Sequence, residues 1–128
     1  MLQHGSCAAR AVGETWRGAL LLGPSGSGKS SLLLRLLGRG WRLVSDDQVR
    51  LTAVPGGGIE AAPPAALRGL LEARGVGIAE GLDHLPRAPL CLVAELVARD
   101  AMPRLPSPGA WVGLDRSVPR IVLHAHDA

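Results

Sequence analysis

The sequence predicts a β-rich α/β protein with few helices, organised around a phosphate-binding loop. Residues 23–30, GPSGSGKS, fit the pattern G-x-x-x-x-G-K-[ST] at every fixed position. An apolar run of strand length, residues 18–22, precedes the loop, and residues 31–37, rich in good helix formers, follow it. Elsewhere the chain has many short strand-like segments and only one or two candidate helices. This combination differs from a doubly wound sheet, which has a helix between every pair of strands.

Length and composition favour one domain that spans residues 1–128. A chain of this length can bury a substantial core. Apolar residues make up 47% of the sequence, but Phe and Tyr are absent. The core must therefore be built from Leu, Val, Ile and Ala, with three Trp residues to accommodate.

Charge and hydropathy argue against several classes of partner. The net charge is +3, but the basic residues are scattered and few aromatic side chains could stack on bases, so nucleic-acid binding is weakly supported. No apolar run reaches the ~18 residues of a membrane span and no signal peptide opens the chain, which predicts a cytoplasmic protein without a membrane partner. Cys7 and Cys91 lie in apolar stretches and are predicted to be buried free thiols.

Turn residues divide the chain into its expected elements. Residues 2–12 predict a first strand, residues 13–18 a turn, and residues 18–22 the second strand of a hairpin. A helix over residues 31–37 should end at Gly38. Further strands are expected at 41–44, 48–54, 59–62, 90–97 and 121–123, and Pro86 and Pro89 bracket the entry to the strand at 90–97. Between these strands we expect a hairpin turn at 55–58, one or two helical turns at 65–73, a loop or strand at 75–78, and a loop at 103–109.

The loop pattern predicts a nucleoside triphosphate site. Glycines let successive backbone N–H groups point at one anion, and the N-terminus of the following helix adds partial positive charge. The Lys29 ammonium would reach the β- and γ-phosphates, and the Ser30 hydroxyl would be a ligand of Mg²⁺. The predicted phosphate-binding residues are Gly23, Pro24, Ser25, Gly26, Ser27, Gly28, Lys29 and Ser30.

Asp46 and Asp47 are the first candidates for catalysis. They end a short apolar strand, and Asp46 follows Ser30 by only sixteen positions, which is room for one helix and one turn. Phosphoryl transfer needs acidic residues near the loop to bind Mg²⁺ and to accept a proton from the attacking hydroxyl. The simpler alternative is that this Asp-Asp pair starts a turn. The phosphate loop upstream favours the functional interpretation.

A second cluster, EARGVGI at residues 72–78, combines a carboxylate, a guanidinium and two glycines. Residue chemistry alone would favour an ordinary helix end with a charge pair. Glu95 interrupts the apolar strand at 90–97 and is either an exposed residue, which we favour, or a second metal contact.

The chain resembles the catalytic domain of the HPr kinase/phosphorylase family, which phosphorylates a serine of the phosphocarrier protein HPr, and in particular its short alphaproteobacterial forms. The resemblance covers nearly the whole chain in order. It is carried by His4-Gly5, GPSGSGKS at 23–30, RLVSDD at 42–47, AAPP at 61–64 and LLEARGVGI at 70–78. The last segment is close to a signature of this family and is not shared by phosphate-loop proteins in general.

The resemblance implies a β-rich, phosphoenolpyruvate carboxykinase-like P-loop fold and a set of roles. ATP would bind the loop, and Ser30 and Glu72 would hold Mg²⁺. Asp47, with Asp46 beside it, would accept the proton of the incoming serine and donate it in the reverse direction. His4 would lie near the transferring phosphate, and Arg104 is placed like an arginine of the family. The implied partners are an HPr-like substrate and further copies of the chain in a homo-oligomer.

The sequence also departs from the family pattern. Residue 31 is Ser where the family usually has an acidic residue, and the turn at 13–18 looks longer than typical. The family's N-terminal domain and C-terminal helices have no counterpart here. The leading interpretation is an ATP- and Mg²⁺-dependent serine kinase, with a nucleotide-binding regulatory module as the alternative. A third interpretation, a small-molecule kinase, is disfavoured because the sequence shows neither a lid segment nor a substrate-binding arginine cluster.

Overall fold

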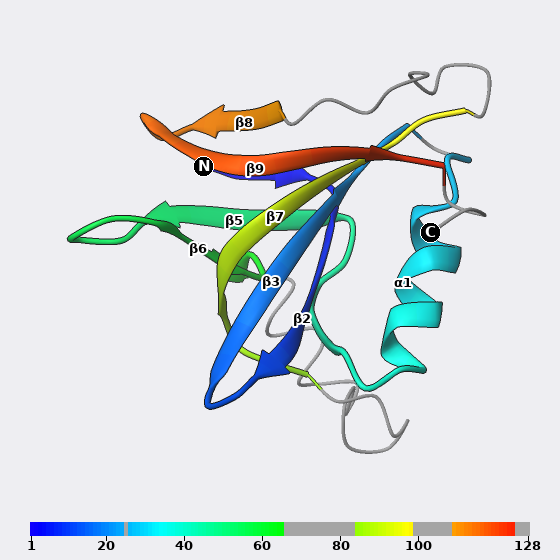
Figure 1. Cartoon of the computed structure of the whole chain (residues 1–128), viewed down its shortest axis with the longest axis horizontal. Coiled ribbons are helices and arrows are strands. Elements are labelled where there is room, and N and C mark those ends of the chain that lie inside the picture. Colours follow the sequence, from blue (N-terminus) through cyan, green and yellow to red (C-terminus); the bar gives the residue numbers. More distant parts are fainter. Residues whose placement is uncertain (25, 66–83, 99–108, 125–128) are drawn as a thin grey trace.

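The computed structural model describes residues 1–24, 26–65, 84–98 and 109–124. Within them the chain forms nine strands and one helix (Figure 1). In chain order the elements are β1 (Leu2–His4), β2 (Ser6–Val12), β3 (Thr15–Leu22), α1 (Lys29–Leu37), β4 (Arg42–Ser45), β5 (Gln48–Ala53), β6 (Ile59–Ala62), β7 (Ala88–Leu96), β8 (Gly109–Gly113) and β9 (Arg116–Leu123). No helix among these residues is long and apolar enough to cross a membrane.

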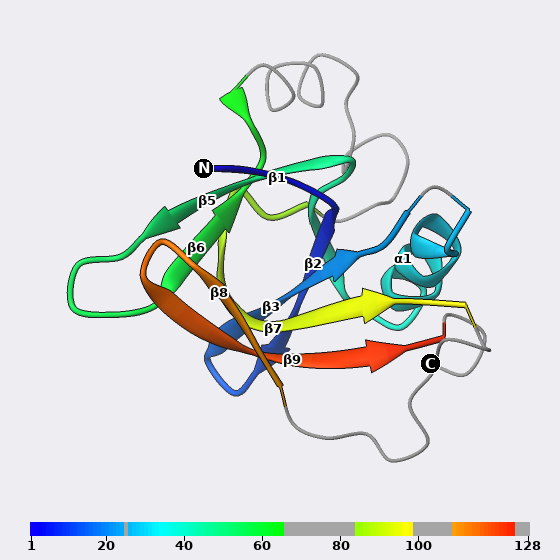
Figure 2. The same ribbon diagram turned by 90° about the horizontal axis from the view of Figure 1, so that it is seen from above.

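The strands form one continuous, mostly antiparallel sheet in the order β1-β5-β6-β7-β3-β2-β4, and β9 joins β7 to β8. Only β3 with β7 and β7 with β9 are parallel. Helix α1 lies beside β2 and β3, and the β5–β6 hairpin lies on the other side (Figure 2). This arrangement confirms the predicted β-rich α/β class.

The predicted first strand at residues 2–12 is in fact two strands that separate at Gly5. β1 pairs with β5, whereas β2 pairs with β3 and β4. A Cβ at Gly5 would lie 2.7 Å from the Leu21 carbonyl oxygen, so only glycine allows this close approach to β3. The hairpin is confirmed, but its turn is only Gly13-Glu14, because the residues from Thr15 on already pair with β2.

Helix α1 begins at Lys29, two residues before the predicted start. Gly28 is its N-cap, and the Gly28 carbonyl accepts the first helical hydrogen bond from Leu32 at 2.9 Å. Lys29 and Ser30 therefore belong to the phosphate-loop motif, but their backbone is already helical. Gly38 ends the helix as predicted.

Three strands toward the C-terminus are longer than predicted or were missed. β7 contains Pro89, which was expected to precede it, and β9 contains Pro119, so prolines hid the start of each strand. Proline lacks the N–H that continues a strand ladder, which makes it a natural sequence signal for a strand end. β8 (Gly109–Gly113) was not predicted, since no element was assigned to residues 110–113 and Gly109 was placed at the end of the predicted loop. The other residues of that loop, 103–108, lie outside the described residues.

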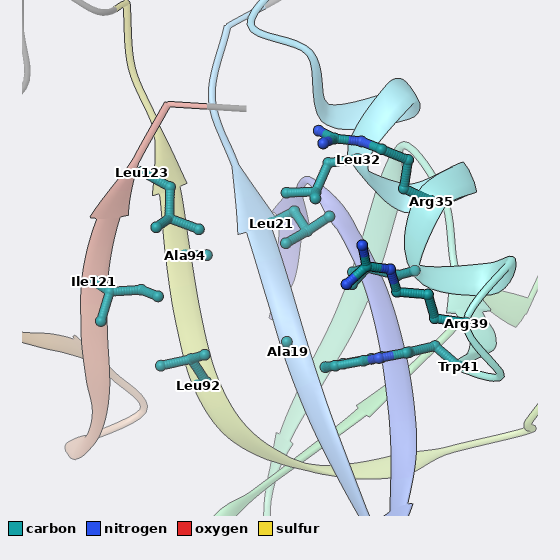
Figure 3. Close-up of a pocket in the computed structure, with 11 residues that line it drawn as sticks. Ala19, Leu21, Leu32, Arg35, Arg39, Trp41, Leu92, Ala94, Ile121 and Leu123 are labelled. Atoms are coloured by element: carbon teal, nitrogen blue, oxygen red, sulfur yellow. The ribbon is translucent and has the colours of Figure 1, made fainter. Parts of the chain in front are cut away.

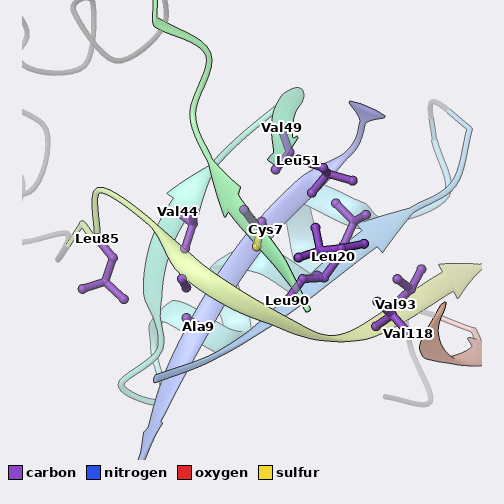
Figure 4. Packing of buried hydrophobic residues seen from close by; sticks show 13 residues of the cluster. Cys7, Ala9, Leu20, Val44, Val49, Leu51, Leu85, Leu90, Val93 and Val118 are labelled. Atoms are coloured by element: carbon purple, nitrogen blue, oxygen red, sulfur yellow. The ribbon is translucent and has the colours of Figure 1, made fainter. Parts of the chain in front are cut away.

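The buried core has two parts, one on each side of the sheet. One part packs β5 and β6 against β2, β3 and β7, with Cys7, Leu20, Leu51, Ile59 and Val93 nearly inaccessible (Figure 4). The other part packs Leu32 and Leu33 of α1 against the opposite face. The core is aliphatic as predicted, and the three Trp residues lie half-buried at its margins.

The two cysteines differ in their surroundings. Both are free thiols, as predicted. Cys7 is buried, and burial, with a smaller contribution from Cys91, raises the pKa of its thiol to about 12. Cys91 is exposed, so the prediction that it is buried was wrong. Cys91 directly follows Leu90, which belongs to the buried core, and because successive side chains of a strand point to opposite faces, Cys91 lies on the face opposite to Leu90.

Candidate functional site

The loop after β3, the β1–β2 junction and the turn between β4 and β5 surround a cavity of about 560 Å³. These segments are far apart in the sequence but adjacent in the sheet, since β2 lies between β3 and β4. The lining residues are His4, Ser6, Pro24, Gly26, Gly28, Lys29, Ser30, Ser31, Asp46 and Asp47. A basic residue and two carboxylates therefore face one space.

The phosphate loop is compact and lies directly against β7. Gly26 and Gly28 have φ values of 81° and 94°, which side chains with a Cβ rarely adopt. The Ser27 amide donates to the Pro24 carbonyl at 3.0 Å and closes the turn. A Cβ at Gly23 would lie 2.9 Å from the Leu96 carbonyl oxygen, so the loop approaches β7 as closely as its backbone allows.

The first turn of α1 opens into the cavity. Lys29, Ser30 and Ser31 are its first residues, and the N–H groups of a first helical turn have no partner within the helix. These donors and the helix dipole favour an anion at this position. No acidic residue occupies this first turn, so nothing in the helix itself opposes a bound phosphate.

The loop backbone and the first turn of α1 together fit a phosphate ligand. The positive-φ backbone at Gly26 and Gly28 turns the chain around the space that Lys29 and Ser30 line. Ser27 Oγ is inaccessible, has no hydrogen-bond partner among the described residues and would lie 2.6 Å from a Cβ at Gly23, so it packs behind the loop and does not face the cavity. The first-turn N–H groups, the Lys29 side chain and the glycine backbone are the features that fit the phosphates of a nucleotide.

The fit to Mg²⁺ depends on oxygen donors. The Ser30 hydroxyl at the start of α1 is such a donor and lines the cavity. Glu72, the second predicted ligand, lies outside the described residues. Within the described ranges, no group of three or more His, Cys, Asp or Glu side chains could hold a metal ion.

The two aspartates lie in a tight turn, residues 45–48, that we call the carboxylate turn. Asp47 has a φ of 72°, in the left-handed region, which costs an ordinary L-residue roughly 1–2 kcal/mol but is more accessible to Asp and Asn. Ser45 is buried and its hydroxyl donates to the Gln48 carbonyl at 2.5 Å. The turn is therefore closed by its own first and last residues.

Three consecutive residues at the β1–β2 junction hold the carboxylate turn. His4 Nε2 lies 3.3 Å from Asp47 Oδ1. The Gly5 amide donates to the Asp47 carbonyl at 3.0 Å. The Ser6 hydroxyl donates to Asp46 Oδ1 at 2.6 Å. The Asp47 side chain nevertheless stays 80% exposed, so a large substrate can reach its free carboxylate oxygen.

The structure brings most of the predicted site residues together. Those that line the cavity are His4, Pro24, Gly26, Gly28, Lys29, Ser30, Asp46 and Asp47, while Gly23 and Ser27 support the loop from behind. Ser25, Glu72 and Arg104 lie outside the described residues. Glu95 is not part of the cavity lining, since it pairs with Arg120 of β9 on the neighbouring strand.

Sequence reasoning missed Ser6 and Ser31, which also line the cavity. Ser31 had been noted only as a departure from the family pattern. Ser6 had one detectable signal: it is the only hydroxyl side chain within the otherwise small and apolar strand segment at residues 5–9. Nothing local in the sequence indicates that its partner is an aspartate 40 residues away.

A second cavity, of about 150 Å³, lies on the face of the sheet that carries α1 (Figure 3). Leu21, Leu92 and Leu123 of three neighbouring strands and Leu32 of α1 line it, with Arg35 and Arg39 at its rim. Its lining is predominantly aliphatic and includes no residue of the loop or the carboxylate turn. It is therefore separate from the candidate phosphate site.

The strand β3, the glycine loop and helix α1 define the chain as an α/β protein of the phosphate-loop class. The family described as the HPr serine kinase C-terminal domain matches residues 8–83, and the chain belongs to this family.

Similar proteins agree with this assignment. An HPr kinase/phosphorylase of Brevibacillus brevis is 48% identical over 61 residues, and one of Leptothrix cholodnii is 52% identical over 61 residues. Each match covers 48% of this chain but only 20% and 19% of those proteins, so the chain matches about a fifth of their length. The solved structure of the Hpr(Ser) kinase/phosphatase from Coxiella burnetii has the same fold, with a TM-score of 0.77 at 24% identity over 99% of this chain and 87% of that one.

Proposed function

We propose that residues 1–128 act as one kinase domain that transfers a phosphoryl group from ATP to a serine of an HPr-like phosphocarrier protein. The observation that carries the proposal is that Asp47 and Lys29 line one cavity. A loop for nucleotide binding alone needs no carboxylate held opposite it. The reaction would serve the regulation of carbon metabolism and the phosphotransferase system in the cytoplasm, by a protein that self-associates.

The nucleotide would be held by the phosphate loop. Backbone N–H groups of the loop and of the first turn of α1 would surround the β- and γ-phosphates, and the Lys29 ammonium would add a full positive charge. Ser30 would hold Mg²⁺, with Glu72 as the second proposed ligand. Bound Mg²⁺ supplies charge neutralisation of the phosphate oxygens during transfer.

Asp47 would act as the general base. Its exposed carboxylate accepts the proton of the substrate serine as the serine oxygen bonds to the γ-phosphorus and the bond to the β-phosphate oxygen breaks. His4, in contact with the same carboxylate, orients it and lies at the mouth of the cavity. As a proton donor, Asp47 also suits the reverse, phosphorylase reaction. Arg104 remains a candidate for stabilising negative charge on the transferred group.

A labelling experiment tests this function. The purified chain is incubated with γ-labelled ATP, Mg²⁺ and HPr from the same genome, and the HPr is analysed for acid-stable label on serine. Labelled phosphoserine that disappears on chelation of Mg²⁺ is the expected result.

The alternative function is a nucleotide-binding regulatory module with little phosphoryl transfer. The observation behind this alternative is that the phosphate loop, Lys29 and the first turn of α1 are sufficient to bind a nucleotide without phosphoryl transfer. Nucleotide binding measured by calorimetry, without any label on HPr, would support this module over the kinase.

A further inference from the structure

Ser6 is a cavity-lining hydroxyl to which the proposed phosphoryl transfer gives no role. It lies on β2 with 2% of its surface exposed. Its register partner is Leu21 of β3, the strand that leads into the phosphate loop. Ser6 is therefore fixed to the same framework as the loop, and it faces the cavity from there.

The Asp46 carboxylate links Ser6 to Asp47. Asp46 Oδ1 accepts a hydrogen bond from the Ser6 hydroxyl at 2.6 Å and another from the Asp47 backbone amide at 3.0 Å. Asp46 is an exposed residue, and a free exposed side chain would sample several rotamers. The bond from buried Ser6 selects the rotamer in which Oδ1 can also reach the Asp47 amide.

The Asp47 backbone needs this support. Its φ of 72° lies in a region that persists in an L-residue when the surroundings hold it there. The two other contacts come from His4 and Gly5, the residues that precede Ser6. Among the described residues, the Asp46 carboxylate is the group that accepts the hydrogen bond of the Asp47 amide. The Gln48 amide donates to the Asp46 carbonyl at 2.9 Å and closes the backbone across Asp47, while the link to Ser6 fixes the Asp46 side chain on the β2 side of the turn.

We propose that Ser6 is the positioning residue of the carboxylate turn: through Asp46 it holds Asp47 in its left-handed conformation and so aims the Asp47 carboxylate into the cavity. Ser6 does not touch the substrate. Its effect on turnover rests on the proposed kinase function, whereas its effect on the conformation of Asp47 does not.

The test compares variants of Ser6 with a matched loss of a hydroxyl elsewhere in the same hairpin. Ser6→Ala removes the donor, Ser6→Cys replaces it by a weak donor of similar size, and Ser6→Thr keeps it. Thr15→Ala is the control, because the Thr15 hydroxyl bonds the Val12 carbonyl at 2.9 Å at the far end of the β2–β3 hairpin. Each variant is studied as the full chain.

Amide hydrogen exchange, followed by NMR, measures how firmly the Asp47 backbone is held, and this measurement does not depend on kinase activity. We expect the Asp47 amide to exchange roughly tenfold faster in Ser6→Ala, which is the change that the loss of one hydrogen bond produces. Exchange should also be faster in Ser6→Cys. It should be unchanged in Ser6→Thr and Thr15→Ala. Unchanged exchange in Ser6→Ala and Ser6→Cys would overturn the inference. Equal acceleration along all of β2 would also overturn it, since Ser6 would then only stabilise the strand.

Kinetic measurements test the effect of the Ser6 variants on serine phosphorylation. In Ser6→Ala the kcat for serine phosphorylation should fall roughly tenfold while the Kd for ATP stays at the wild-type value, and Ser6→Thr should restore kcat. A fall in ATP affinity instead would assign Ser6 to the loop and overturn the inference. If the wild-type chain transfers no phosphate but the Asp47 amide responds as expected, the proposed function fails and the role of Ser6 stands.

Discussion

The phosphate loop and the carboxylate turn face the same cavity, but different parts of the chain hold them in shape. The loop is closed by contacts among near neighbours, such as the Ser27 amide on the Pro24 carbonyl at 3.0 Å. The carboxylate turn is also closed locally, by Ser45 on Gln48, but its two aspartates are held by the β1–β2 junction, whose closest contact, from Ser6 to Asp46, spans 40 residues. Damage to the loop should therefore remove nucleotide binding, and damage to the turn should spare it.

The largest expected effect is that of Lys29→Ala. Lys29 is the one Lys or Arg side chain that lines the cavity among the described residues, and the variant removes it. Affinity for ATP should fall roughly 10- to 100-fold, the usual range for a charge-assisted hydrogen bond, and phosphoryl transfer should be lost. Isothermal titration calorimetry and the labelling assay measure the two quantities.

Arg39→Ala is the matched control for Lys29→Ala. Arg39 is exposed just beyond the other end of α1 and does not line the phosphate cavity. Its removal takes away one positive charge without changing the site. Unchanged ATP affinity in Lys29→Ala, or an equal loss in Arg39→Ala, would show that the loop does not bind the nucleotide as proposed.

Asp47→Asn tests the other region. The substitution keeps the size of the side chain and removes its ability to accept a proton at neutral pH. Turnover should fall by roughly 10²–10⁴, the usual contribution of a positioned general base, while ATP affinity stays close to wild type. Single-turnover kinetics with HPr and calorimetry with ATP give the two values.

Asp115→Asn is a close control, because Asp115 is also exposed with a left-handed φ, of 57°, in the turn between β8 and β9. It should leave turnover unchanged. If extra Mg²⁺ restores much of the rate of Asp47→Asn, then Asp47 acts on the metal instead of the proton. Wild-type rates in Asp47→Asn and Asp46→Asn, separately and together, would contradict the kinase proposal.

The same contrast explains which features the sequence could predict. The loop at residues 23–30 is specified by consecutive residues, so its place between strand and helix was predicted and confirmed. Asp46 and Asp47 were predicted as a pair for a local reason, the end of an apolar strand. Their contact with Ser6 could not be predicted, because it depends on β2 lying between β3 and β4.

The errors in the strand predictions have the same origin. The first strand divides at Gly5 because β1 pairs with β5 whereas β2 pairs with β3 and β4, and these pairings exist only in the folded sheet. Pro119 lies inside β9 although proline normally marks a strand end. In both places the tertiary pairing determined the element boundary, and local residue preference did not.

Glu72→Gln examines a residue that belongs to neither region. If Glu72 is a ligand of Mg²⁺, the amide supplies a neutral oxygen in place of an anionic one and binds the metal more weakly. The Mg²⁺ concentration needed for half-maximal transfer should rise roughly tenfold, with kcat at saturating Mg²⁺ little changed. Titration of the labelling assay with Mg²⁺ measures this shift. Glu60→Gln, on β6 away from the cavity lining, is the control, and an unchanged Mg²⁺ requirement in Glu72→Gln would place Glu72 outside the site.

The smallest expected effect comes from a pair of glycines at the two ends of α1. Gly28 has a φ of 94°, so Gly28→Ala must either adopt an unfavourable left-handed backbone or change the loop. It should lower the free energy of unfolding by roughly 1–2 kcal/mol and weaken ATP binding, since the loop loses its shape.

Gly38 has a φ of −66°, and a Cβ there would meet atoms no closer than 3.5 Å. Gly38→Ala should therefore leave ATP binding unchanged and stabilise the fold slightly, because alanine restricts the unfolded chain more than glycine does. Urea denaturation of both variants, with and without ATP, measures the difference. If Gly28→Ala is as stable as Gly38→Ala and binds ATP as the wild type does, the loop does not depend on its glycine backbone, and the contrast with the carboxylate turn no longer holds.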